Sequence, residues 1–79
     1  MPRTKHRLDP TEDVFAIRLI VQLKMHGTTN RELAKAIGMD PSTISRYCNG
    51  IVSPNAYALT HIARYFDVSV DYLLGLREK

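Results

Sequence analysis

The side chains best suited to recognising another molecule lie on one predicted helix, residues 41–49. Its outward face carries hydroxyl, guanidinium and amide groups and no acid: Ser42, Ser45, Arg46 and Asn49. Arg46 offers a planar fork of donors that can bond to O6 and N7 of guanine, worth about 1–3 kcal/mol of discrimination between bases. Such a face suits the major groove of DNA, and the alternative role for Arg46 is a surface ion pair.

Residues typical of catalysis or metal binding form no pattern in this chain. His6, His26 and His61 lack a spacing that would place two of them on one helical face, and Cys48 is the only cysteine. Zinc sites are built from several cysteine and histidine ligands, and no Gly-rich phosphate loop or strand–turn–helix serine motif occurs. We therefore expect no enzymatic activity, no metal and no cofactor.

Two short helices joined by a tight turn are predicted to position the polar face. Thr29 can cap the first helix, and Glu32, three residues later, completes a capping box. Gly38 can adopt the positive φ that ends a helix. Asp40 is then a suitable N-cap for the second helix, with Pro41 at its first position.

Small and apolar residues around the turn indicate that the two helices cross closely. Ala34 leaves room at the middle of the first helix, while Met39 and Ile44 can fill the corner between the two axes. Tyr47 follows Ile44 at helical spacing and is expected to be buried with it. A short turn containing glycine, combined with a close crossing, is typical of the helix-turn-helix motif.

The order of these residues resembles the Cro/repressor-type (lambda-repressor-like, XRE family) helix-turn-helix domain of phage and bacterial regulators. The matching residues are Glu32–Met39, Ser42–Arg46, Asn49–Ile51, Ser53–Tyr57, Leu59, Ile62, Ala63, Val68–Val70 and Tyr72–Gly75. The resemblance implies an all-α fold, a compact five-helix bundle. It also implies a sequence-specific DNA-binding transcriptional regulator, a repressor of phage or mobile-element type that inserts residues 41–49 into the major groove of an operator.

In this family the start of the recognition helix contacts bases, and the surrounding residues contact phosphates. The resemblance therefore assigns base contacts to three side chains: Ser42, Ser45 and Arg46. Pro41 replaces the glutamine that several relatives carry, and it cannot read a base by hydrogen bonding. Phosphate contacts are expected from four further positions: Asn30, Thr43, Asn49 and Asn55. Asn49 and Asn55 are also suited to capping helices.

We predict two parts in the chain, a disordered basic N-terminal arm at residues 1–8 and the helix-turn-helix domain at residues 9–76. The arm carries Arg3, Lys5 and Arg7, which can lie along DNA or belong to a frayed terminus. With the last helix ending near Gly75, no attached sensor or peptidase domain is expected.

The first helix, expected over residues 9–25, contains more apolar residues than one buried stripe requires. Asp9 or Thr11 can cap it. The predicted core residues are Phe15, Ile20 and Leu23. Leu19 or Val21 is then surplus, and such a surplus means either extra burial or a surface for a partner.

Two further helices are predicted, one starting at Ser53 or Asn55 and one at residues 70–74 after a Ser69 cap. The residues of the first that are expected to face inward are Ala56, Leu59, Ile62, Ala63 and Phe66. Ile51 and Val52 should close the bundle. Three tyrosines are expected at the edge of the core: Tyr57, Tyr65 and Tyr72. A dimer seam can be formed by Tyr72, Leu73, Leu74 and Leu76.

Composition and charge agree with one small domain that has an anionic partner. The chain has 79 residues, 44% of them hydrophobic, and a net charge of +3. Residues 1–52 hold 8 basic and 5 acidic groups, whereas residues 53–79 hold 3 of each, so the excess lies with the helix-turn-helix half. A single cysteine and the lack of an apolar run of about 18 residues favour a cytoplasmic protein.

The same fold is compatible with other roles. An antitoxin-like or adaptor module would mainly bind a protein partner, and a third possibility is an interaction domain without DNA binding. The leading prediction has double-stranded operator DNA as its partner, a possible homodimer, no membrane and no small-molecule ligand. Two-fold pairing would match a palindromic operator whose half-sites are about 34 Å apart.

Overall fold

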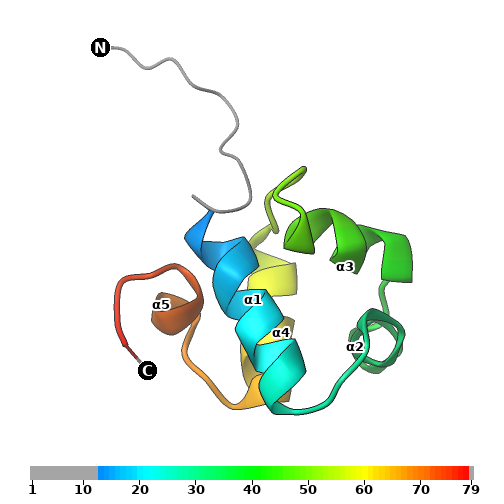
Figure 1. Cartoon of the computed structure of the whole chain (residues 1–79), viewed down its shortest axis with the longest axis horizontal. Coiled ribbons are helices and arrows are strands. Elements are labelled where there is room, and N and C mark those ends of the chain that lie inside the picture. The colour runs from blue at the N-terminus through cyan, green and yellow to red at the C-terminus, as the bar shows by residue number, and fades with distance from the viewer. Residues whose placement is uncertain (1–12, 79) are drawn as a thin grey trace.

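The computed structural model describes residues 13–78, which form five helices and no strand in that range. The helices are α1 (Val14–Met25), α2 (Asn30–Ile37), α3 (Pro41–Cys48), α4 (Ala56–Phe66) and α5 (Val70–Leu73). In Figure 1, α1 lies in front of α4, with α2 and α3 on one side of this pair and α5 on the other. The predicted all-α five-helix bundle is confirmed.

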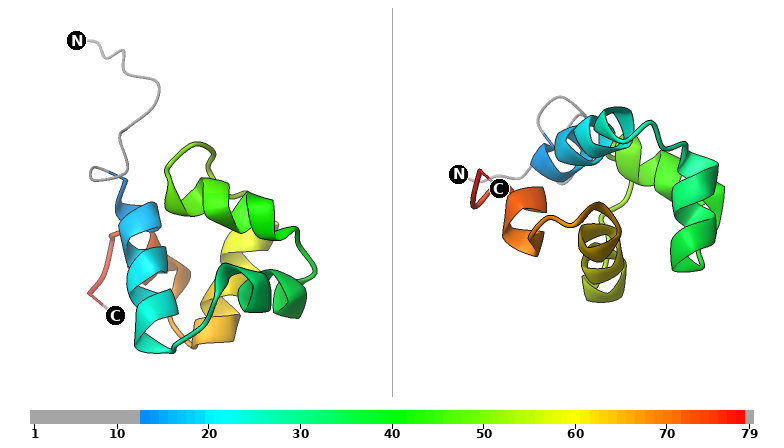
Figure 2. Two further views of the ribbon diagram at one scale, coloured as in Figure 1. Left: turned by 45° about the vertical axis from the view of Figure 1, so that its right-hand side comes forward. Right: turned by 90° about the horizontal axis from the view of Figure 1, so that it is seen from below.

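Contacts between helices far apart in the sequence close the bundle. Helix α2 packs on α3 and α4, α3 packs on α1, and α5 packs on both α1 and α4. The turned views in Figure 2 show α2 and α3 joined at a sharp angle, with the outer side of α3 uncovered by other helices. The bundle therefore holds α3 from behind, and leaves its outer side open.

The predicted turn between α2 and α3 is confirmed. The Thr29 hydroxyl accepts a hydrogen bond from the Glu32 amide at 3.0 Å, and the Glu32 carboxylate accepts one from the Thr29 amide at 2.9 Å. Gly38 has φ of 72°, in the left-handed region where a side chain would be strained. Asp40 caps α3 with Pro41 at its first position, as expected. The turn is thus specified by local residues alone.

The remaining helix ends agree in part with the sequence. Asn55 caps α4 and Ser69 caps α5. Helix α1 begins at Val14 with Asp13 as its N-cap, so the prediction of Asp9 or Thr11 as its cap is wrong. The Asp13 carboxylate accepts from the Ala16 amide at 3.1 Å, because it directly precedes the first residue of helical conformation. The expected basic arm at residues 1–8 lies outside the described residues.

The core corrects the predicted rotation of α1. Phe15, Leu19 and Leu23 are buried, whereas Ile20 is only half-buried, so Leu19 belongs to the core in place of Ile20. Ala16 and the polar Gln22 are also buried, and the Gln22 amide nitrogen donates to the Tyr72 hydroxyl at 3.2 Å. Hydrophobic periodicity assigns apolar residues to the buried face of a helix, so it does not predict that Gln22 is buried. The buried face of α1 is therefore rotated relative to the one inferred from the sequence.

The second half of the chain brings further corrections. Ala58 is buried and Ala56 is exposed, although Ile62, Ala63 and Phe66 are buried as predicted. Leu59 is half-buried and packs against the core. Helix α4 starts at Ala56, one residue after the Asn55 cap, and its rotation determines which of these side chains are buried.

The connection between α3 and α4 does not close the bundle. Ile51 and Val52 are exposed, because the chain after α3 first turns through Gly50 and the Ile51 amide donates back to the Arg46 carbonyl at 3.0 Å. This bond completes the helix end and directs the two side chains outward.

The tyrosines divide between surface and core edge. Tyr57 and Tyr65 are exposed, so their prediction as core-edge residues is wrong, while Tyr72 is half-buried as expected. The centroids of the Tyr57 and His61 rings are 4.2 Å apart. The Tyr65 ring packs edge-on against the Phe66 ring, with the centroids 4.9 Å apart. Aromatic neighbours along α4 therefore stabilise these rings at the surface.

Candidate nucleic-acid interface

The rotation of α3 is fixed by two buried side chains. Ile44 is fully buried, and the Tyr47 ring packs edge-on against Phe15 with the ring centroids 5.8 Å apart. The opposite face consequently carries the polar residues of the helix. Ser42, Arg46 and Asn49 are exposed, while Thr43 and Ser45 are half-buried.

Arg46 is available for an external ligand. Its side chain has no hydrogen bond or ion pair to any residue between 13 and 78, and it is exposed. The alternative of a surface ion pair is therefore not realised within the described residues. Among the causes that shift the pKa of Asp40, the hydrogen bonds from Ser42 are the largest and the charge of Arg46 is the smallest. Because the Arg46 guanidinium has no partner among residues 13–78, all its N–H donors remain available for a ligand.

The start of α3 orients one predicted base-contacting side chain. The Asp40 carboxylate accepts from both the amide and the hydroxyl of Ser42, each at 2.9 Å. These two hydrogen bonds are the main reason why the pKa of Asp40 lies below its ordinary value of 3.8. The Ser42 hydroxyl hydrogen is thus directed to the Asp40 carboxylate, and only the oxygen lone pairs remain for an external partner.

Sequence reasoning identified Asp40 as a cap and missed this second effect. An aspartate two residues before a serine is a known local hydrogen-bonding arrangement, so the spacing could have suggested it. The consequence concerns specificity. A serine that presents only acceptors can bond to an amino group of adenine or cytosine in the major groove, but not to guanine O6 or thymine O4.

The start of α2 lies beside the end of α3. The Asn30 side-chain oxygen is 4.0 Å from the Cys48 sulfur, so these two helix ends form one continuous edge. Burial raises the pKa of the Cys48 thiol, which keeps it protonated and able to donate to that oxygen. The Asn30 amide nitrogen has no partner in the part of the chain that the structure describes, and it remains a donor for a phosphate.

The Glu32 carboxylate moderates the attraction of phosphate to the start of α2. Because Glu32 bonds to the Thr29 amide, its negative charge lies at the positive end of the helix dipole. A phosphate there would meet an acid as well as free N–H groups. A phosphate at this end of α2 would therefore depend on a side-chain donor such as the amide nitrogen of Asn30.

The two remaining asparagines are engaged by their own helices. The Asn49 side-chain nitrogen donates to the Ser45 carbonyl at 3.0 Å, and the Asn55 oxygen accepts from the Ala58 amide at 2.9 Å. Both capping roles foreseen from the sequence are thus present. Asn55 still has its amide nitrogen as a donor, since capping uses only its oxygen. The predicted arm residues Arg3, Lys5 and Arg7 lie outside the described residues.

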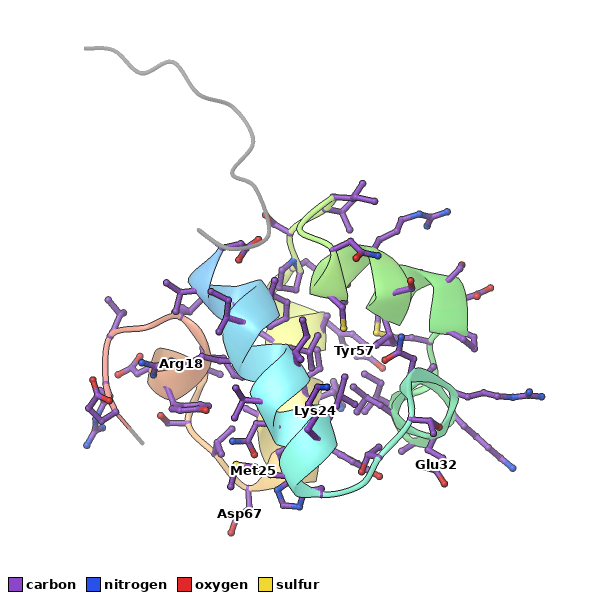
Figure 3. All side chains as sticks on the ribbon, viewed as in Figure 1. Arg18, Lys24, Met25, Glu32, Tyr57 and Asp67 are labelled. Carbon is purple, nitrogen blue, oxygen red and sulfur yellow. The ribbon has the colours of Figure 1, made fainter. Side chains whose placement is uncertain are left out.

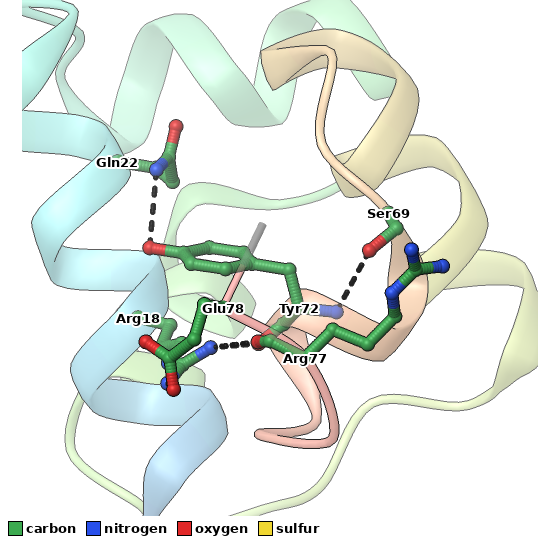
Figure 4. Close-up of polar contacts among 6 residues, drawn as sticks. All are labelled: Arg18, Gln22, Ser69, Tyr72, Arg77 and Glu78. Atoms are coloured by element: carbon green, nitrogen blue, oxygen red, sulfur yellow. Dashed lines mark hydrogen bonds and ion pairs between the residues drawn. The ribbon is translucent and has the colours of Figure 1, made fainter.

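A second cluster of polar residues lies away from α3 and holds the end of the chain. Arg18 donates to the Tyr72 carbonyl at 2.9 Å and to the Arg77 carbonyl at 2.6 Å, and its guanidinium lies 4.6 Å from the centre of the Tyr72 ring (Figure 4). Gln22 supports the same ring from its hydroxyl end. Arg18 is therefore a structural residue of the α1–α5 contact.

Comparison with known proteins agrees with this geometry. The helix-turn-helix family model matches residues 20–73, which include α2, α3, α4 and α5. The chain belongs to the Cro/repressor-type helix-turn-helix family. A member of known sequence, the uncharacterized HTH-type transcriptional regulator YobD of Bacillus subtilis (strain 168), is 37% identical over 65 residues. That alignment covers 82% of this chain and 58% of YobD, so this chain spans little more than half of its relative's length.

Two solved structures have a similar arrangement of helices. The SOS-response transcriptional repressor LexA from Eubacterium rectale is 30% identical with a TM-score of 0.74, covering 77% of this chain and 65% of LexA. The P22 c2 repressor, in complex with the synthetic operator 9T, has a TM-score of 0.75 at 24% identity, covering 80% of this chain and 96% of the repressor. The likeness to the P22 repressor is one of fold.

Within residues 13–78, no group of three or more histidine, cysteine, aspartate or glutamate side chains is arranged to hold a metal ion. None of the helices in this range is both long enough and apolar enough to cross a membrane.

Proposed function

We propose that the protein is a sequence-specific DNA-binding transcriptional regulator, a repressor of phage or mobile-element type that inserts α3 into the major groove of an operator. The observation that carries the proposal is the exposed Arg46 guanidinium, which has no hydrogen-bond or ion-pair partner among residues 13–78. A cation with unused donors on the outer face of a recognition helix is suited to guanine. Such a protein would act in the cytoplasm of a prokaryotic cell, and its role requires no catalysis.

In this proposal the base contacts come from Ser42, Ser45 and Arg46. Asn30 and Asn55 supply phosphate contacts from the two flanks of α3, each with a side-chain N–H that has no other partner in the described chain. Thr43 and Asn49 are further phosphate contacts, and Arg3, Lys5 and Arg7 are candidates for contacts from the N-terminal arm. Phosphate contacts fix the orientation of the helix, and base contacts provide the specificity.

The proposal is tested by selecting bound sequences from a random pool of DNA duplexes with the full chain. A specific regulator enriches one motif, and a homodimer enriches a palindrome whose half-sites are about one helical turn apart. A protein with 6–10 phosphate contacts should lose roughly 10³–10⁵ in affinity between about 50 and 200 mM salt. Failure to enrich any motif would contradict the proposal.

An adaptor that mainly binds a protein is the second candidate. The observation in its favour is the apolar outer face of α1, which no described helix covers. The two candidates respond differently to salt, because an apolar contact persists at salt concentrations that dissociate a phosphate contact.

A further inference from the structure

Helices α1 and α4 end beside one another, on the side of the bundle remote from α3 (Figure 1). The rings of His26 and Phe66, at these two ends, have their centroids 5.2 Å apart. A cavity of about 640 Å³ lies between the two ends and α5. We call it the helix-end cavity, and its wall includes Gln22, Met25, Asp67, Val68, Tyr72 and Glu78. The DNA contacts proposed above use none of these residues.

Two helix dipoles make the surroundings of the helix-end cavity negative. Its wall contains Met25, the last residue of α1, and Asp67, the C-cap of α4. The C-terminal end of a helix carries a partial negative charge, because its last carbonyl groups lack amide partners within the helix. Both helices therefore favour a cation in this cavity.

Two carboxylates add to this negative charge. The Asp67 carboxylate has no hydrogen bond or ion pair with any residue between 13 and 78. Glu78 lies 4.0 Å from Arg18, but its side chain is 95% exposed, so solvent screens this ion pair. The basic residues in the last turns of the two helices, Lys24 and Arg64, are not part of the cavity wall. Within the described part of the chain, the wall therefore contains acids and no base.

A buried hydrogen-bond acceptor also belongs to the cavity wall. Gln22 is 5% exposed, and its amide nitrogen donates to the Tyr72 hydroxyl at 3.2 Å and to the Met25 sulfur at 3.8 Å. Figure 4 shows the Gln22 oxygen turned away from Tyr72, and this oxygen has no partner among residues 13–78. Burying a polar atom without a hydrogen bond destabilises a protein. A donor bound in the cavity would supply the partner that this oxygen lacks.

The remaining wall is apolar and suits a short hydrocarbon chain. Met25 supplies a flexible thioether, and Val68 is half-buried against the core. Figure 3 shows Met25 and Asp67 at the same end of the bundle, so the apolar and the charged parts of the wall adjoin.

Tyr72 belongs to this wall rather than to the dimer seam expected from the sequence. It is held by Arg18 and Gln22, and its neighbour Leu73 is fully buried inside the protein. Of the expected seam, only Leu74 and Leu76 are exposed. The Tyr72 ring is therefore a fixed surface against which a ligand can pack.

We propose that the helix-end cavity binds a small organic cation, a primary ammonium group on a short apolar chain. The ammonium donates to the Gln22 oxygen, the Asp67 and Glu78 carboxylates balance its charge, and the chain packs against Met25 and Val68. An ammonium is a compact cation with three donors, which matches this combination of acids and a carbonyl. The sequence led us to expect no small-molecule ligand. This inference does not rest on DNA binding, and its test contains no DNA.

The test is an NMR titration of the isotope-labelled full chain with n-butylammonium chloride at constant ionic strength. Saturable shifts are expected at the Gln22 side-chain amide and along residues 67–72, with a dissociation constant on the order of 1–10 mM for so small a probe. Butan-1-ol has the same chain and no charge, and it should bind at least about fivefold more weakly.

Matched variants locate the charge that the probe recognises. Asp67→Asn should weaken binding by about two- to fivefold, because it removes one carboxylate and asparagine tolerates the positive φ of 57° at this position. Asp71→Asn is the control, since Asp71 is an exposed acid of α5 outside the cavity wall, and it should leave binding unchanged.

A second probe tests the hydrogen bond to Gln22. Butyltrimethylammonium keeps the charge and the chain but has no N–H donor, so wild-type protein should prefer butylammonium over it. This preference should shrink in Gln22→Leu, which lacks the acceptor. Circular dichroism verifies that each variant is folded.

Four results would overturn the proposal. They are an absence of saturable shifts up to about 100 mM butylammonium, which lies far above the expected dissociation constant, equal affinity for butan-1-ol, equal losses in Asp67→Asn and Asp71→Asn, and an unchanged preference between the two cations in Gln22→Leu. None of these results would bear on the DNA-binding role of α3.

Discussion

Hydrogen bonds within the protein decide which groups on α3 remain available for the proposed DNA partner. Arg46 keeps all its donors, Ser42 gives its hydrogen to Asp40, and Asn49 donates to the Ser45 carbonyl. The sequence was sufficient to place these residues on one polar face, because their types and helical spacing define it. It did not reveal the direction of each hydrogen bond, since that depends on the conformation of the preceding turn.

Replacing Arg46 with alanine tests its role as the principal base contact. We expect Arg46→Ala to weaken binding to the selected operator by about 1–3 kcal/mol and to relax preference at one base pair. Arg64→Ala is the charge-matched control, because Arg64 is exposed on α4 rather than α3. Fluorescence anisotropy with labelled duplex measures both. Equal losses for the two variants would indicate general electrostatic attraction instead.

Two substitutions of Asp40 separate its charge from its orienting effect on Ser42. Asp40→Asn retains an oxygen that can accept from the Ser42 hydroxyl, whereas Asp40→Ala releases that hydroxyl to donate as well as accept. Wild type and Asp40→Asn should prefer adenine or cytosine at the position read by Ser42. Asp40→Ala should additionally accept guanine or thymine there.

The position that Ser42 reads is located by comparing motifs selected with wild type and Ser42→Ala. A preference for guanine or thymine in the wild-type motif would show that Ser42 donates to the base. The inferred orientation of its hydroxyl would then be wrong.

At the scale of the helices, the α2–α3 crossing determines how far α3 projects from the bundle. Ala34, which the sequence predicts to lie at this crossing, is fully buried, while Ala36, two residues later, is exposed. Ala34→Leu should therefore overpack the contact and reduce the free energy of unfolding by about 1–3 kcal/mol. Ala36→Leu adds the same volume to the same helix without a contact. Thermal unfolding compares them, and equal melting temperatures would rule out a close crossing at Ala34.

The α1–α5 contact depends on Arg18 in a way that the sequence did not indicate. Its two hydrogen bonds to main-chain carbonyls and its position over the Tyr72 ring join segments more than 50 residues apart. Its ion pair with Glu78, at 4.0 Å and with Glu78 almost fully exposed, contributes little.

Replacing Arg18 with glutamine should remove most of this contact. We expect Arg18→Gln to reduce the free energy of unfolding by about 1–3 kcal/mol, since two carbonyl groups lose a charged donor. Glu78→Gln, which removes only the ion pair, should have almost no effect. Chemical denaturation measures both variants. A larger effect of Glu78→Gln than of Arg18→Gln would assign the contact to the ion pair.

At the scale of the whole molecule, features that depend on neighbouring residues were predicted more accurately than features that depend on tertiary contacts. Thr29, Gly38, Asp40 and Ser69 fixed helix ends correctly, because capping depends on residues only a few positions apart. The rotation of α1 was misjudged, because burial of Gln22 depends on Tyr72, fifty residues later in the chain. The surplus of apolar residues on α1 was visible in the sequence, but which of them are exposed required the tertiary contacts.

The central claim, that Arg46 on α3 reads a base pair in the major groove, is tested most directly by methylation interference. Methylation of guanine N7 blocks an arginine bonded to that edge. With wild-type protein, methylation of one guanine in the selected half-site should abolish binding, and with Arg46→Ala the same methylation should have no effect. Equal interference in both proteins, or none at any guanine in the motif, would contradict the account.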